Sequence, residues 1–378
     1  MKKTLLTFAA LTALIAATLT LPSCSKKSEL IPLNLQPIVY QNENITFTVD
    51  PKLELLMIAM RLAEWEPFSI DAYSDNYNQY NTAIDKFFEK QKDHPFVKEL
   101  KSRNTKKNHD NFTNILSITN YISDDLTTIN IKKKELPPEL KIFWKDLNPQ
   151  AFIAQFNDFA VTSNYDKIWM LYMQQLKNQA VNVKEFYTFN QRTTNWVSSY
   201  FFDTAKQPEY IFSATTMSGA YNFTLSPVDN KGKLLLKSLQ AAYFTKDSDW
   251  NACDSAFSIA YGYIFSTLQN HWELLSNDAE RITKAIYEEN QITEKINEAD
   301  IKMFFARILT YCSLFDYEYY KDDEDNRTVL YNALGSQFLI PDPDKYIAIT
   351  EYYQEHRDQY PSFETFVEDY LPQIIKEL

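Results

Sequence analysis

Glycine is very scarce in this chain of 378 residues: the four glycines are Gly219, Gly232, Gly262 and Gly335. Tight hairpins and bends in sheets need backbone conformations that glycine adopts more readily than any other residue. A chain this poor in glycine therefore has few places where a strand can reverse sharply, and helices joined by loops are favoured. We predict a mainly α fold with a small β-sheet or hairpin, of the α+β class.

The clearest helical pattern lies between Asp249 and Tyr320. Apolar residues recur three or four positions apart in two runs, so that each run buries one stripe. The first run comprises Phe257, Ala260, Tyr261, Ile264, Leu268, Trp272 and Leu275, and the second comprises Ile301, Phe304, Phe305, Ile308, Leu309 and Cys312. These runs predict two long helices at the centre of the fold.

Strand character is confined to short segments. Residues 45–49 alternate between apolar and polar side chains, and the Asp50-Pro51 pair that follows is typical of a helix start, with Asp as the cap and Pro in the first turn. Residues 209–217 and 221–225 are β-prone and flank Ser218-Gly219, a turn signal. We expect these two segments to form a hairpin or a small sheet.

The first residues are typical of a bacterial lipoprotein leader. Lys2 and Lys3 precede an apolar run that ends in Leu21-Pro22-Ser23-Cys24, which resembles the cleavage site at which a cysteine is acylated. We expect a signal peptide over residues 1–23, lipidation of Cys24, a flexible tether over residues 24–44 and one domain over residues 45–378. The chain would then be held on the outer membrane of the cell envelope, on its periplasmic or its surface side. An ordinary signal peptide with a chance cysteine is the alternative.

Composition excludes one class of partner. The formal net charge of −12 argues against nucleic acid, because binding to phosphates requires clustered cations. Aromatic residues make up 15% of the chain, and most fall on helical stripes beside Leu and Ile, which favours a core role over a carbohydrate-stacking surface. Cys253 and Cys312 can form a disulfide or remain free, and the sequence leaves both open.

Known catalytic patterns are missing from the sequence. A helix that presents two zinc ligands needs histidines four residues apart, and none of His94, His109, His271 and His356 has such a partner. The chain contains no Gly-x-Ser-x-Gly elbow and no glycine-rich phosphate loop. Paired carboxylates stay open, because sequence gives no distances. We therefore predict no metal, no cofactor and no catalytic residues.

Several short segments together resemble a family of uncharacterised Gram-negative lipoproteins, a domain-of-unknown-function group whose intact members are similar to gluzincin HExxH metallopeptidases. The matching pieces are Glu54-Leu55-Leu56, Arg61-Leu62-Ala63, Ile84-Asp85 with Phe87-Phe88, His94-Pro95, Phe156, Phe159, Tyr165, Glu298, Phe305-Ala306-Arg307, and Tyr360, Phe363 and Phe366. The resemblance implies a zincin-like helical domain. It also implies that HExxH would fall within residues 257–265, where this chain reads FSIAYGYIF.

The resemblance further implies where a degenerate cleft would lie. Ser258, Ile259 and Gly262 would stand on the former zinc helix, and Glu280 or Glu298 would occupy the place of the third metal ligand. Gly219, Ala220, Tyr221 and Asn222 look like the edge strand that holds a peptide backbone in gluzincins, although a simple hairpin turn explains them as well.

These observations lead to one expected function and two alternatives. We expect a lipid-anchored, non-catalytic relative of zinc peptidases that binds a peptide or a protein. A glycan-binding or nutrient-uptake lipoprotein is the first alternative, and an exposed row of Trp and Tyr would favour it. A hydrolase with paired carboxylates is the second, and it requires two acids that face each other across a pocket.

Overall fold

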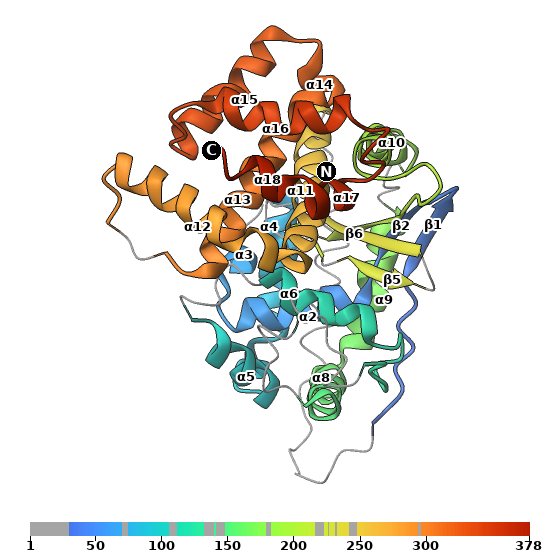
Figure 1. The fold of residues 1–378 in the computed structure, drawn as a ribbon. Coiled ribbons are helices and arrows are strands. Elements are labelled where there is room, and N and C mark those ends of the chain that lie inside the picture. Colours follow the sequence, from blue (N-terminus) through green and yellow to red (C-terminus); the bar gives the residue numbers. More distant parts are fainter. Residues whose placement is uncertain are drawn as a thin grey trace.

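A computed structural model describes residues 30–69, 75–105, 112–131, 140, 148–178, 183–215, 223–225, 227–230, 233–241, 248–293 and 296–378. The described residues form a mainly helical fold with one small mixed sheet, which confirms the predicted fold class (Figure 1). The sheet lies at one side of the molecule. Helices α14 (Glu318–Lys321), α15 (Glu324–Gln337) and α16 (Pro343–Glu355) lie at one end, and α5 (Pro95–Arg103) and α8 (Pro149–Thr162) lie at the other (Figure 1).

The first half of the described chain contains α2 (Pro51–Leu62), α3 (Glu66–Ser69), α4 (Asp75–Phe87), α5 (Pro95–Arg103), α6 (Phe112–Ser117), α8 (Pro149–Thr162), α9 (Tyr165–Asn178) and α10 (Val183–Phe201). The second half contains α11 (Ser248–Asn270), α12 (Trp272–Glu289), α13 (Glu298–Ser313), α14 (Glu318–Lys321), α15 (Glu324–Gln337), α16 (Pro343–Glu355), α17 (Phe363–Asp369) and α18 (Leu371–Ile374). Short 3-10 helices cover Glu89–Gln91, Ile118–Tyr121 and Leu314–Asp316.

The sheet consists of β1 (Ile38–Asn42), β2 (Ile45–Val49), β3 (Glu209–Thr215), β4 (Phe223–Thr224), β5 (Val228–Asn230) and β6 (Lys233–Ala241). The strand order is β1-β2-β3-β6-β4, and β5 also pairs with β6. β2, β3 and β6 run parallel to one another, whereas β1, β4 and β5 are antiparallel to their neighbours.

Two expectations about strands need correction. The β-prone segments around Ser218-Gly219 do form β3 and β4, but β6 lies between them, so they do not pair as a hairpin. Residues 30–44, which we assign to the tether, belong to the folded domain: β1 pairs along β2, and Leu35 is buried. The buried leucine and the strand that follows it hold this segment on the fold. Its polar, proline-spotted composition does not reveal either feature.

The two faces of the sheet differ in chemistry. One face carries Phe47, Tyr210, Phe212 and Leu236, which are all buried. It packs against α10, where the Tyr210 hydroxyl lies 2.7 Å from the Ser198 hydroxyl. On the other face the strand register places Thr46, Ile211 and Lys237 side by side. The start of α2 meets this second face: its cap Asp50 pairs with Lys237, and buried Glu54 accepts a hydrogen bond from Thr215.

The predicted central helices are present, with one correction. The first apolar run does not form a single helix: it is divided at His271, so Trp272 and Leu275 belong to α12. The second run forms α13, whose apolar stripe is buried. Aromatic side chains fill the core, and Trp65, Trp169, Trp196 and Trp272 are all buried, as expected for a core role. Among the described residues no helix is both long and apolar enough to cross a membrane.

Candidate functional site

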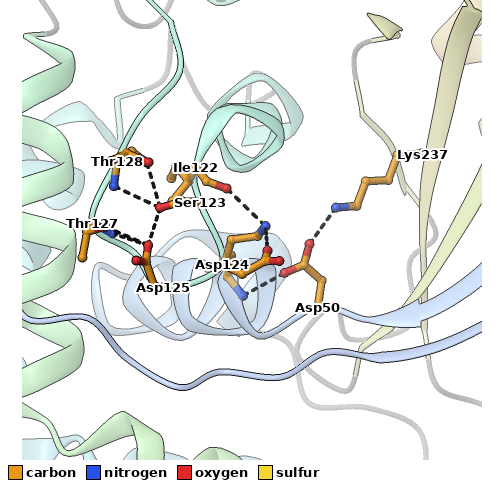
Figure 2. Close-up of polar contacts among 9 residues, drawn as sticks. Asp50, Ile122, Ser123, Asp124, Asp125, Thr127, Thr128 and Lys237 are labelled. Carbon is orange, nitrogen blue, oxygen red and sulfur yellow. Dashed lines mark hydrogen bonds and ion pairs between the residues drawn. The ribbon is translucent and has the colours of Figure 1, made fainter. Parts of the chain in front are cut away.

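Two lysines and two aspartates converge on the polar face of the sheet. Lys237, in the middle of β6, donates to Asp50 Oδ2 at 2.8 Å, and both side chains are at most 10% exposed. Asp50 is the residue that caps α2, so its Oδ1 also accepts the backbone N–H of Lys52 at 2.9 Å. The Lys52 ammonium then donates to Asp124 at 2.5 Å and to the Ile122 carbonyl at 3.2 Å. Figure 2 shows this chain of contacts.

The surroundings favour the charged forms of Asp50 and Lys52. Burial favours the neutral form of Asp50, but the ammonium groups of Lys237 and Lys52 outweigh it and lower the pKa of that carboxyl. Burial also disfavours the charged form of Lys52, yet Asp50 and Asp124 together raise its pKa. Loss of one partner of a buried ion pair strongly destabilises the fold, so this pair holds the start of α2 against β6.

The loop that carries Asp124 is itself firmly held. Ile122 and Ile129 form a β-bridge across it, and Asp125 accepts hydrogen bonds from the Ser123 hydroxyl at 2.6 Å and from the Thr127 backbone at 3.1 Å (Figure 2). Leu126 is buried with a φ of 58°, a conformation uncommon for a residue with a side chain. Backbone strain of this kind persists where surrounding contacts impose it. Asp124 is therefore presented to Lys52 by a preformed loop.

A cleft of about 350 Å³ opens over this cluster. Its volume lies at the lower end of the range of about 300–1,000 Å³ that is typical of small-molecule sites. The lining residues are Pro37, Val39, Thr46, Thr48, Asp50, Lys52, Thr119, Asn120, Asp124, Ile211, Val228, Leu235 and Lys237. Five of them are apolar and the others are polar or charged, so the cleft can hold a ligand with an apolar body and a polar end.

The sequence pattern did not indicate this site, although it contains two usable signals. Asp50-Pro51 predicts the helix cap, and Lys237 interrupts an apolar run in residues 233–241 (KLLLKSLQA). A lysine inside a strand whose neighbours are apolar requires a buried counter-charge. The sequence alone does not say which of 50 acidic residues supplies it.

The site residues predicted on the former zinc helix lie elsewhere, where α11 packs on β4. The Ser258 hydroxyl lies 3.0 Å from that of Thr224, and Ile259 is buried. A Cβ atom built on Gly262 would lie 2.6 Å from Thr224 Cγ2, so the helix and the strand are in direct contact there. Of these residues none lines the 350 Å³ cleft.

The predicted carboxylates are engaged on the surface of their own helices. Glu280 pairs with Lys284 at 2.5 Å and Glu298 pairs with Lys302 at 2.8 Å, each within one helical turn. Within the described ranges no three His, Cys, Asp or Glu side chains are grouped so that they could hold a metal ion. The structure therefore gives neither glutamate a set of co-ligands.

One prediction involves a side chain that is not described, and two others fall on residues outside the described ranges. Cys24 and the segment Gly219, Ala220, Tyr221 and Asn222 lie there, so the lipidation site and the proposed edge strand stay predictions. Cys312 is a free, buried thiol, so it forms no disulfide with Cys253, whose side chain is not described. Burial raises the pKa of the Cys312 thiol well above its ordinary value, which is typical of an inert core cysteine.

Comparison of the chain with protein-family models, with curated proteins and with solved structures finds no match. The resemblance to the lipoprotein family and to gluzincin peptidases thus stays a prediction from the sequence.

Proposed function

We propose that this chain is a lipid-anchored, non-catalytic binding module of the bacterial cell envelope, and that the cleft over β1, β2, β3 and β6 holds its ligand. The observation that carries the proposal is the cleft itself: its floor is fixed by the buried Lys237–Asp50 pair, and its walls combine apolar and polar side chains. A preformed cleft of mixed lining is the ordinary form of a small-ligand site. The ligand class we favour is a short peptide or the end of a protein chain.

This proposal moves the binding site away from the helix that the peptidase resemblance implies. Contact between Gly262 and Thr224 leaves no room for a peptide between α11 and β4. The descent from zinc peptidases is therefore not needed for the proposed function, which depends only on the cleft and on the lipoprotein leader.

The carboxylates of the cleft support binding over hydrolysis. A glycosidase-like pair needs one acid that is protonated and one that is ionised, which requires environments that drive their pKa values apart. Asp50 is kept ionised by Lys237 and Lys52, and Asp124 lies on Lys52 at the surface. Both carboxylates already form ion pairs with lysines, so neither is placed to act as the protonated acid of such a pair.

A glycan-binding role is also less well supported. The four tryptophans whose side chains are described are buried, and the exposed tyrosines Tyr40 and Tyr331 lie on β1 and α15. These do not form the contiguous row of exposed aromatic rings on which sugars would stack.

Binding in the cleft is testable with a variant that fills it. We expect Ile211→Trp to abolish the binding of short apolar peptides. Ile211 lies on β3, between β2 and β6, and the larger ring would fill part of the cleft above these strands. A panel of di- and tripeptides is screened by chemical-shift perturbation on the purified full chain. Val329→Trp, on an exposed position of α15 outside the cleft, is the matched control and should bind as the parent does. Equal binding by the Ile211 variant would contradict the proposed site.

The anchor has a separate test. We expect Cys24→Ala to abolish incorporation of labelled palmitate and to move the chain from the membrane to the soluble fraction in a Gram-negative host, because acyl chains on Cys24 would supply the membrane affinity. Cys253→Ala is the control and should remain in the membrane fraction. Persistent membrane association of the Cys24 variant would contradict the anchor without bearing on the cleft.

A further inference from the structure

The cleft contains hydrogen-bond donors that no described residue accepts from. Lys237 has three N–H groups, and its ammonium makes one hydrogen bond in the described structure, to Asp50. The Asn120 amide nitrogen is buried and has no hydrogen-bond partner among the described residues. Each Asp50 oxygen already accepts one hydrogen bond, Oδ2 from Lys237 and Oδ1 from the backbone of Lys52. The donors of Lys237 and Asn120 that no described residue uses call for an oxygen acceptor.

The charges of the cleft residues indicate that the ligand's oxygen acceptor is a monoanion. The charged residues that line the cleft are Asp50, Lys52, Lys237 and Asp124. The first three have side chains that are 8–13% exposed and together carry one positive charge, whereas Asp124 balances it from the rim with 67% exposure. Buried Glu54 on α2 accepts from Thr215 and does not line the cleft. One excess positive charge suits a carboxylate better than a dianionic phosphate.

The apolar lining of the cleft sets the rest of the ligand. Pro37, Val39, Ile211, Val228 and Leu235 are apolar lining residues. They suit a branched aliphatic group, and about 350 Å³ suits a ligand of one or two residues.

We propose that the cleft recognises a carboxylate next to a branched aliphatic group, with the carboxylate on Lys237 and Asn120 and the aliphatic group on Val39, Ile211 and Leu235. This inference rests on the proposed binding function and specifies its ligand. The C-terminus of an apolar peptide and a free branched-chain acid share this chemistry.

The test uses three probes on the full chain in isothermal titration calorimetry: N-acetyl-alanyl-leucine, its C-terminal amide, and 4-methylpentanoate. We expect the peptide acid to bind at least about tenfold more tightly than the amide, which corresponds to one charge-assisted hydrogen bond. Binding of the peptide acid but not of 4-methylpentanoate would assign the site to peptide C-termini, and the reverse would assign it to free acids. Equal affinity for the acid and the amide would overturn the carboxylate inference while leaving the binding module in place.

Two variants test the assigned partners. Asn120→Leu should weaken binding of the acid about tenfold without lowering thermal stability, because the amide nitrogen has no partner to lose in the unliganded protein. Asp124→Asn should tighten binding of the acid relative to the amide, because it removes the rim charge that repels an anion. Asp93→Asn, an exposed aspartate outside the cleft, is the charge control and should change neither affinity. Weaker acid binding in Asp124→Asn, or unchanged acid binding in Asn120→Leu, would overturn the inference.

Discussion

Lys237→Met is expected to destabilise the fold by about 3–5 kcal/mol, because it leaves Asp50 as a buried carboxylate without its main counter-charge. The Lys237 ammonium lies 2.8 Å from Asp50, and neither side chain is more than 10% exposed. Methionine retains an unbranched side chain of similar length, so the loss measured is mostly electrostatic. Urea unfolding at neutral pH, followed by circular dichroism, gives the difference in the free energy of unfolding.

The pH dependence of stability provides a check on the cause. In the parent, burial raises the pKa of Asp50, but Lys237 and Lys52 together lower it by more than burial raises it. The folded pKa therefore lies below the ordinary 3.8. Such a group stabilises the fold above the unfolded pKa, and this contribution is lost as pH falls through the folded pKa. In Lys237→Met burial should prevail and the folded pKa of Asp50 should rise. The sign then reverses, and the variant should gain stability relative to the parent as the pH is lowered through that raised pKa.

A double variant separates the charge from the packing. Asp50→Asn combined with Lys237→Met removes both charges, and asparagine still caps α2 by accepting from the Lys52 backbone. We expect its stability to return to within about 1 kcal/mol of the parent. A single Lys237→Met variant as stable as the parent would show that the pair is not buried in the folded protein.

The parts of the fold that follow from sequence are those decided by neighbouring residues. Asp50-Pro51 predicts the start of α2, where the Asp50 side chain accepts the Lys52 backbone N–H and Pro51 stands in the first turn. Cap and first turn lie within four residues, so a short-range signal suffices. Helical stripes were likewise recognisable in α11 and α13.

Other parts depend on contacts between distant residues. Strand β6 was not recognised, because Lys237 is compatible with an apolar strand only when Asp50, 187 positions away, covers its charge. The division at His271 was missed for a related reason: periodicity indicates which side chains are buried, and it does not show where the helix axis changes direction. The cleft joins β1, β2, β3, β6 and the loop at Asp124, so no local pattern contains it.

Two residues of α11 also show that a contact between distant residues cannot be predicted from a local pattern. Ser258 and Gly262 are small residues one helical turn apart, and sequence identifies them only as an interruption of an apolar stripe. In the structure the interruption is what allows β4 to approach α11 closely. Close contact between the helix at Gly262 and the Thr224 side chain explains the absence of a larger side chain here, without reference to a lost metal site.

Gly262→Ala is the second prediction with a large effect, and its sign is opposite to the usual one. Alanine in place of glycine normally stabilises a helix interior by about 1 kcal/mol. At Gly262 the new Cβ would lie 2.6 Å from Thr224 Cγ2 and 2.7 Å from Thr224 Cβ, so α11 and β4 must move apart. We expect a loss of about 1–3 kcal/mol in the free energy of unfolding, as for other overpacked cores.

Gly335 offers a matched control, because it lies in the last turn of α15 and a Cβ added there meets no atom within 4 Å. Gly335→Ala should therefore stabilise the protein by about 0.5–1 kcal/mol, through helix propensity alone. Thr224→Gly removes both of the atoms nearest to the new methyl group, so adding it to Gly262→Ala should cost less than the sum of the two single variants. Stabilisation by Gly262→Ala similar to that by Gly335→Ala would mean that α11 and β4 are farther apart than the structure places them, and α11 would then have room for a ligand beside it.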